Sequence, residues 1–190
     1  MTESPGPFSR VPSFLANLWR HAFWIVFFVG GSVFGNPPPA VSFDGKTLVK
    51  AYEKAENGAS VIEYLPKGET LETWKRLASY LTFSGMDDPK MLALSMARSV
   101  LEKNPNAKHA LVEHPRTKDV ILDFVTWPPD ESFIEFNVFH ITRSGREELQ
   151  LQQYALRAYG KDIQPFLKSL PAERERLVEL MAKSGLKKLK

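Results

Sequence analysis

Three histidines and several nearby carboxylates are the residues best suited to metal or acid–base chemistry. A metal site needs such side chains to converge on one ion. His109 and Glu113 are four residues apart, which on a single strand separates them by about 13 Å. No spacing in the sequence brings the others together, so we predict neither a metal ion nor a cofactor. The residues concerned are His109, Glu113, His114, Asp119, Asp123 and His140.

Motifs for nucleophilic or acid–base catalysis are missing from the sequence. It contains no Gly-x-Ser-x-Gly elbow, no His-Glu-x-x-His and no phosphate-binding glycine loop. The paired acids Asp130-Glu131 and Glu147-Glu148 fall in turn sequences, where solvated acids are expected. We therefore predict no catalytic residue and expect a binding protein rather than an enzyme. A hydrolase-like enzyme with a dispersed site, formed by His140 and a carboxylate, stays open as the alternative.

Aromatic and arginine side chains concentrate in the C-terminal half of the chain. Such residues dominate recognition hot spots, and their positions on predicted strands and hairpin ends indicate a docking surface. The alternative is that the terminal helices simply cover the rings. The candidate binding residues are Trp127, Phe139, His140, Arg143 and Tyr154, with Phe133, Arg146, Arg157 and Tyr159 near them in sequence.

Composition and charge are those of an ordinary globular domain. The 190 residues are 43% hydrophobic and 25% charged, and the formal net charge is +3 with both signs mixed along the chain. A nucleic-acid partner calls for a basic stripe, so we predict none. The absence of cysteine excludes disulfides and thiol nucleophiles. We therefore expect an envelope protein or a small ligand as the partner, and make no prediction of oligomeric state.

The first 35 residues have the pattern of an export signal. Two arginines precede an uncharged run over residues 22–34, which as a helix reaches only about 20 Å and is short for a membrane span. Val33 and Gly35 suit cleavage before Asn36. We therefore predict a signal peptide over residues 1–35 and a mature protein in the periplasm or cell envelope. The alternatives are an uncleaved anchor, with residues 22–34 in the membrane and the protein a structural component, and a buried core helix.

Periodicity after this segment predicts one domain. Residues 36–44 are rich in proline and read as an extended leader with no core to join, so the domain covers residues 45–190. Alternating apolar residues predict strands, and three- and four-residue apolar spacing predicts helices. The predicted elements are a hairpin over 47–65 turning at Asn57-Gly58, helices over 70–81 and 89–103, a meander with strands at 108–113, 119–127, 133–143 and 147–159, and helices over 162–170 and from Pro171 to a stop at Gly185.

The strand over residues 133–143 has two different faces. Ile134, Phe136, Val138 and His140 share one face, and Phe133, Glu135, Asn137, Phe139 and Ile141 share the other. One of these faces is expected to be core and the other half wet.

These elements together predict an α+β domain preceded by a hydrophobic signal helix. Its antiparallel sheet, the N-terminal hairpin plus the four-stranded meander, is covered by two central helices and the C-terminal helices. This order resembles the PsbP and Mog1 type of fold, and the phrase from Glu63 to Trp74 resembles uncharacterised exported bacterial proteins. The fold resemblance implies an accessory or binding module. We therefore expect an exported protein that acts by recognising a protein or a ligand.

Overall fold

The computed structural model describes residues 38–189, and the predicted signal segment lies outside them. None of the helices within this range is both long enough and apolar enough to span a membrane. The elements in chain order are β1 (Ala40–Phe43), β2 (Lys46–Glu56), β3 (Ala59–Leu65), β4 (Arg76–Ser84), α2 (Pro89–Lys103), β5 (Lys108–Glu113), β6 (Val120–Thr126), β7 (Phe133–Gly145), β8 (Glu148–Tyr159), the 3₁₀ turn η2 (Gly160–Asp162), α3 (Ile163–Ser184) and β9 (Lys187–Leu189).

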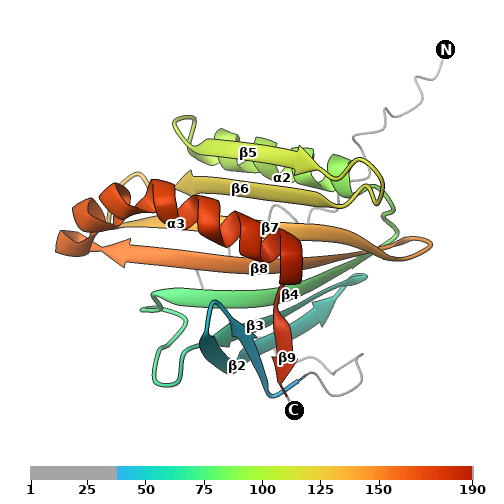
Figure 1. The fold of residues 1–190 in the computed structure, drawn as a ribbon, viewed down its shortest axis with the longest axis horizontal. Helices are drawn as coiled ribbons and strands as arrows, with labels where there is room; N and C mark the ends of the chain where they lie inside the picture. Colours follow the sequence, from blue (N-terminus) through green and yellow to red (C-terminus); the bar gives the residue numbers. More distant parts are fainter. Residues whose placement is uncertain (1–37, 190) are drawn as a thin grey trace. The chain divides into compact units, whose positions relative to one another are not determined.

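All strands join one antiparallel nine-stranded sheet in the order β5-β6-β7-β8-β4-β3-β2-β1-β9 (Figure 1). The predicted meander is confirmed as β5 to β8, and the predicted hairpin as β2 and β3. Asn57 and Gly58 both have positive φ, at 51° and 77°, as a tight hairpin turn requires. The long-range pairing of β4 with β8 then joins the two halves of the sheet.

The predicted helix over residues 70–81 is wrong, because residues 70–75 form no helix and residues 76–81 belong to strand β4. Its apolar residues match helical spacing only because the strand is central and both of its faces are buried. Such a strand shows apolar residues at nearly every position instead of alternating cleanly. The PsbP-like arrangement with two central helices is therefore incorrect, and α2 is the one helix between β4 and β5.

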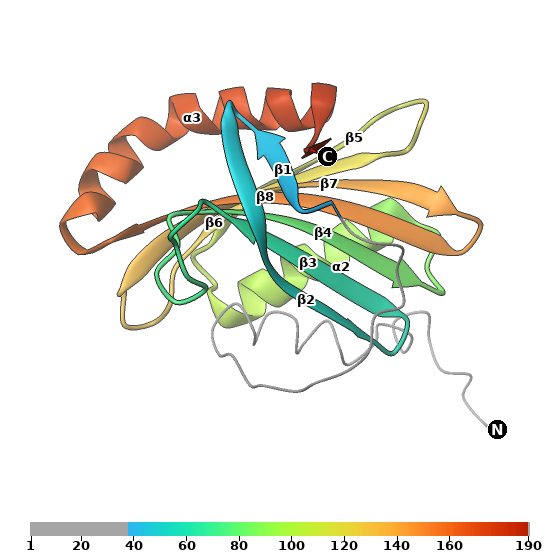
Figure 2. The ribbon, with the colours of Figure 1, turned by 90° about the horizontal axis from the view of Figure 1, so that it is seen from below.

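Helix α2 begins and ends where the sequence predicts. The Asp88 carboxylate accepts hydrogen bonds from the backbone nitrogens of Lys90 and Met91, at 2.8 and 3.1 Å, and Pro89 opens the first turn. Its apolar face packs mainly on β5, β6 and β7. It lies on the opposite side of the sheet from α3 (Figure 2).

Helix α3 is one continuous helix of 22 residues, whereas the sequence predicts two that meet at Pro171. Pro171 is exposed, and the apolar stripe runs on past it through the buried Leu177 and Met181. Packing of this stripe offsets the backbone hydrogen bond that the proline ring cannot make. The two predicted helices therefore merge.

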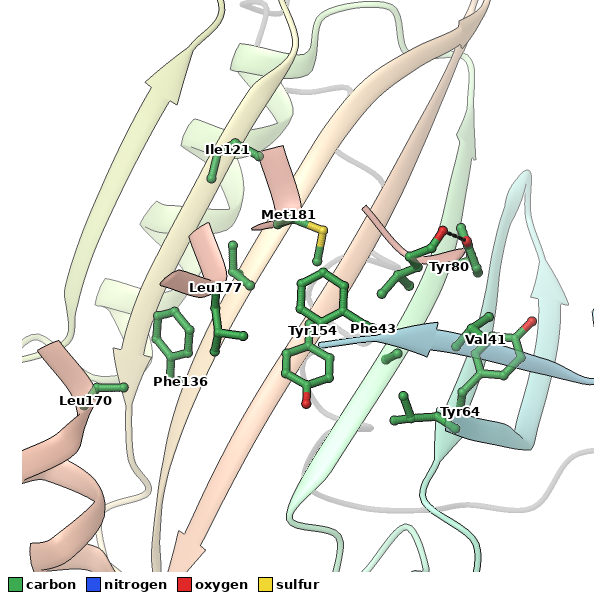
Figure 3. Packing of buried hydrophobic residues seen from close by; sticks show 14 residues of the cluster. Val41, Phe43, Tyr64, Tyr80, Ile121, Phe136, Tyr154, Leu170, Leu177 and Met181 are labelled. Carbon is green, nitrogen blue, oxygen red and sulfur yellow. Dashed lines mark hydrogen bonds between the residues drawn. The ribbon is translucent and has the colours of Figure 1, made fainter. Parts of the chain in front are cut away.

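The main core lies between α3 and the sheet (Figure 3). Leu170, Leu177 and Met181 of α3 gather there with the rings of Phe136 and Tyr154. The predicted leader contributes to the same core through β1, whose Val41 and Phe43 are buried, in contrast to the expectation that this stretch joins no core. The domain therefore includes residues 40–43.

The turn after α3 is fixed to the sheet by two hydrogen bonds. The Tyr80 hydroxyl donates to the Leu186 carbonyl at 2.9 Å, and the Leu186 backbone nitrogen donates to Oε1 of Gln152 at 2.6 Å. Gly185 ends the helix with φ of 56°, a conformation that favours glycine. Strand β9 then pairs with β1 and holds α3 against the sheet.

Candidate functional site

A buried group of polar side chains interrupts the apolar face of the sheet on the α2 side. We call it the polar cluster. A central sheet face is normally apolar, and buried polar groups on one are a recognised mark of function. The cluster draws from four strands and consists of Glu63 on β3, Ser79 on β4, Glu135 and Asn137 on β7, and Gln153 and Arg157 on β8.

One end of the polar cluster is a fully paired arginine. Arg157 donates through Nε and Nη2 to Oε2 of Glu135, at 2.9 and 2.5 Å, and both residues are buried. Its guanidinium carbon lies 3.9 Å from the ring centroid of Trp74 and 4.1 Å from that of Phe133, a cation–π contact on each. The Tyr159 hydroxyl closes this end by donating to the Trp74 carbonyl at 3.0 Å. Arg157 is therefore held rigidly, with its charge compensated.

A directed chain of hydrogen bonds leads away from this ion pair. The Glu135 carboxylate only accepts, so the Asn137 amide must turn its Nδ2 toward Oε1 of Glu135, at 2.7 Å. Oδ1 of Asn137 is then the acceptor for Nε2 of Gln153, also at 2.7 Å. In the described chain nothing donates to the remaining oxygen, Oε1 of Gln153. The chain thus fixes the orientation of each amide and ends in an acceptor.

The other end of the polar cluster is incompletely bonded. Ser79 is the register partner of both Gln153 and Glu63, so these three side chains form one row across β8, β4 and β3. The Ser79 hydroxyl is fully buried and has no hydrogen-bond partner within residues 38–189. Glu63 likewise has no bonded partner among the described residues. A buried polar atom left without a bond costs about 1–3 kcal/mol, so this row is an unusual feature for a purely structural core.

The environment of Glu63 changes its acid–base behaviour. Removal from water raises the pKa of its carboxyl to about 7. Arg157 opposes the rise in pKa, and the negative charge of Glu135 adds to it. Glu63 and Gln153 keep partial solvent exposure, so this end of the cluster reaches water. The site can accept hydrogen bonds and can exchange a proton near neutral pH.

Two buried tyrosine hydroxyls on the other face of the sheet, those of Tyr64 and Tyr154, also lack a hydrogen-bond partner in the described part of the chain. Their rings are tightly packed, with Tyr154 4.5 Å from Phe43 and Tyr64 6.2 Å from Tyr80 between ring centroids. Burial raises the pKa of both hydroxyls to about 12, so they stay neutral. They are best explained by the apolar area that their rings bury.

A groove of about 420 Å³ lies between the β1–β2 turn and the C-terminal half of α3. Its charges are largely paired within the protein. Arg176 binds the carboxylates of Asp44 and Glu173, and Lys183 binds Glu179. The groove is therefore an open, charged surface whose ionic groups already satisfy one another.

The profile of an uncharacterised protein family matches residues 35–186. The chain belongs to this family. A search of curated proteins found no significant match. Among solved structures, the crystal structure of human STARD10 is similar to this chain at 10% sequence identity and a TM-score of 0.28, covering 72% of this chain and 74% of that one. The family match does not confirm the PsbP/Mog1 resemblance.

The five predicted binding residues of this family member do not meet at one place. Phe139 and Arg143 lie on the α2 side of β7, while His140 and Tyr154 lie on the α3 side. Phe139 stacks on Phe124 with 5.9 Å between ring centroids, and Nε of Arg143 donates to the Asp87 carbonyl at 2.9 Å. Trp127 follows β6, where its carbonyl accepts a bond from Asn104. Tyr154 is covered by the α3 core, as the alternative interpretation expected.

The predicted metal and acid–base residues are also dispersed. No group of three or more potential metal ligands occurs between residues 38 and 189. Nδ1 of His114 is a hydrogen-bond partner of Thr117 in a turn. Nε2 of His140 lies 3.8 Å from Oδ2 of Asp119, and burial lowers the histidine pKa while that carboxylate raises it. A histidine and an acid therefore do come together, at His140.

Sequence reasoning did not single out the polar cluster. Glu135 and Asn137 were only placed together on one face of their strand, and the expectation that one face of this strand is half wet is wrong, because residues on both faces are buried. Phe133, Arg157 and Tyr159 come together through the pairing of β7 with β8. Ser79 carried no usable signal, because its segment matched a helix. In the sequence, Glu63 and Gln153 look like ordinary polar residues of strands. Their relation is visible only in the structure, where β4 lies between β3 and β8.

Proposed function

We propose that this protein is an exported accessory module that binds a small ligand at the polar cluster. The observation that carries the proposal is the row Glu63, Ser79 and Gln153, which presents hydrogen-bonding atoms that no described residue satisfies. Binding sites are typically apolar with a few convergent polar groups. The Arg157–Glu135 ion pair is connected to the row through Asn137, which bonds both Glu135 and Gln153. This connection holds Gln153 in place and so lowers the entropy cost of binding a ligand.

Export is the second part of the proposal and rests on the N-terminal sequence pattern. The expected working molecule begins near Asn36 and resides in the periplasm or at the cell envelope. N-terminal sequencing of the protein from its native host tests this directly. A chain that starts at residue 1 or 2 and stays in membranes after carbonate extraction would favour the anchored structural component instead.

Ligand binding is tested by native mass spectrometry of the full-length protein under gentle conditions. We expect a bound small molecule at one per chain in the wild type and its loss in Ser79→Val, which fills the row with a methyl group. Ser60→Val is the matched control, since Ser60 is a buried serine on β3 that bonds Thr82 at 2.5 Å on the other face. A wild type without ligand that also shows no thermal shift with a metabolite library would reject the proposal.

A hydrolase-like enzyme remains a second candidate, favoured by the approach of Asp119 to His140. A carboxylate beside a histidine is the arrangement that orients a general base. Turnover of a panel of ester substrates that is abolished by His140→Gln, with folding intact, would establish it. Equal turnover by His140→Gln and the wild type would eliminate it.

A further inference from the structure

The row at the end of the polar cluster offers acceptors in excess of donors. Arg157 directs donors to Glu135 and Tyr159, and the amides of Asn137 and Gln153 each direct one N–H to an oxygen within the cluster. What remains is the Glu63 carboxylate, the Ser79 hydroxyl oxygen and Oε1 of Gln153. Three adjacent strands thus contribute one acceptor each, and the complementary ligand is rich in donors.

We infer that this row binds a primary ammonium group, with Glu63, Ser79 and Gln153 each accepting one of its three N–H bonds. The inference rests on the proposed function and names the ligand class. A primary ammonium has three donors and no acceptor, so each of its N–H groups can be paired with one oxygen of the row. The bond to Glu63 is charge-assisted and supplies most of the affinity.

The spacing of the strands fits this geometry. Directly opposed side chains on antiparallel strands have Cβ atoms about 4.5–5.5 Å apart. Ser79 is short and central, and its two register partners carry longer side chains on either side. Their end groups can lean over the serine, so that one nitrogen lies about 2.8–3.0 Å from an oxygen of each. A single nitrogen therefore reaches all three strands.

Other ligand classes fit less well. An anion would meet the carboxylates of Glu63 and Glu135, while the one cation of the cluster is already paired. A calcium ion takes six to eight oxygen ligands, typically several carboxylates, and the row supplies one carboxylate. A quaternary ammonium has the charge but no donor, so it would leave Ser79 and Gln153 unsatisfied.

Charge at the row links ammonium binding to pH. The titratable groups near Glu63 on this face are Glu135 on β7, Arg157 on β8, and Tyr52, Lys54 and Glu56 on the neighbouring β2. Lys54 is paired with Glu56 at 2.6 Å, which leaves Glu63 as the group that titrates near neutrality, with its pKa raised to about 7. Ammonium binds the ionised form, so affinity should fall by roughly tenfold per pH unit below that pKa.

The experiment titrates full-length protein with n-hexylamine, n-hexanol and hexyltrimethylammonium, three probes with the same alkyl chain. Binding is followed by the NMR signals of the Gln153 side-chain amide, assigned by their loss in Gln153→Met. We expect hexylamine to bind at least tenfold tighter than either other probe at pH 8. Glu63→Gln and Ser79→Ala should each weaken it at least tenfold. Glu175→Gln, which removes an exposed charge on α3, is the control and should change nothing.

The outcomes separate the inference from the proposed function. Hexanol or the quaternary probe binding as tightly as hexylamine, with loss in Ser79→Ala, overturns the ammonium assignment and leaves ligand binding at the cluster intact. Hexylamine binding that is unchanged in both variants overturns the assignment to this row. No shift of the Gln153 amide with any probe also overturns it, and the mass-spectrometry experiment then decides on the proposed function independently.

Discussion

On the α3 side of the sheet, where the buried hydroxyls of Tyr64 and Tyr154 are also without a partner among the described residues, the polar contacts of the helix and its following turn join both segments to the strands. Arg174 binds Asp123 of β6 in a two-bond ion pair at 2.6 and 2.8 Å, and Leu186 is held by Tyr80 and Gln152. On the α2 side, the polar cluster joins strands to one another, and it ends in atoms that nothing in the described chain satisfies. The contacts on the α3 side hold that helix in position, whereas the polar cluster on the α2 side leaves hydrogen-bonding atoms open.

This difference separates stability from recognition within one sheet. Polar groups that complete their bonds fix a unique packing, and those left open reduce stability unless a ligand completes them. The α3 side should therefore govern the free energy of unfolding without affecting ligand binding. The α2 side should affect both the free energy of unfolding and ligand binding. The bonded end of the polar cluster should stabilise the fold, and the open end should reduce stability when no ligand is bound.

The largest effect is expected at the closed end of the polar cluster. Arg157→Met leaves the Glu135 carboxylate buried without its cation and should destabilise the protein by about 3–5 kcal/mol in urea denaturation. The double variant Glu135→Leu/Arg157→Met removes both charges and should recover most of this loss. A double variant as unstable as the single one would mean that the aromatic contacts of Arg157, and not its charge pairing, hold this end together.

A core substitution on the α3 side should cost nearly as much but leave recognition alone. Leu177 is fully buried between α3 and the sheet, so Leu177→Ala opens a cavity and should lose about 3 kcal/mol. Leu167→Ala on the same helix, where the side chain is 37% exposed, is the control and should change stability by less than about 0.5 kcal/mol. Ligand affinity of folded Leu177→Ala below the wild-type value would show that the two faces are coupled.

The open end of the polar cluster should give stability a specific pH dependence. Glu63 has an ordinary pKa of 4.5 when unfolded and about 7 when folded. Below pH 4.5 it is protonated in both states. Between those values the unfolded chain ionises first, so stability falls as pH rises, by at most about 3 kcal/mol, and partial exposure of the side chain reduces this.

Glu63→Gln isolates this contribution. The variant should be more stable than the wild type at pH 8 and equal to it near pH 4, as measured by urea denaturation across that range. His140 acts in the opposite direction, because its lowered pKa removes stability as pH falls, but it is present in both proteins and cancels in their difference. Parallel pH profiles for the two proteins would mean that Glu63 titrates normally.

Local sequence patterns predicted those parts of the fold that local contacts determine. The meander from β5 to β8 follows from alternation and turn residues within a continuous stretch. Strand β4 was mistaken for a helix because its neighbours, β3 and β8, bury both faces, and β8 comes from more than 60 residues further along the chain. Nothing within residues 70–81 encodes that partner.

The polar cluster depends on the same long-range pairing. The sequence placed Glu135 and Asn137 on one face of a strand, but the row of Glu63, Ser79 and Gln153 exists only once β4 lies between β3 and β8. Candidate residues chosen by side-chain type, such as Tyr154 and Phe139, fall on opposite faces of the sheet. Selection by residue type alone therefore gave aromatic residues of the core. The candidate row became recognisable only from the register of the strands.

The smallest expected effect compares two buried serines, one on each face. Ser60 bonds Thr82 at 2.5 Å on the α3 side, so Ser60→Ala should leave the Thr82 hydroxyl with one bond fewer and lose about 1 kcal/mol. Ser79 has no bond to lose within residues 38–189, so Ser79→Ala should be neutral or slightly stabilising in the unliganded protein. With ligand present the order reverses, because only Ser79→Ala forfeits the stabilisation that binding adds to the folded state. Equal losses for both variants without ligand would show that the Ser79 hydroxyl is satisfied, for example by a buried water, and that the open row is not a binding site.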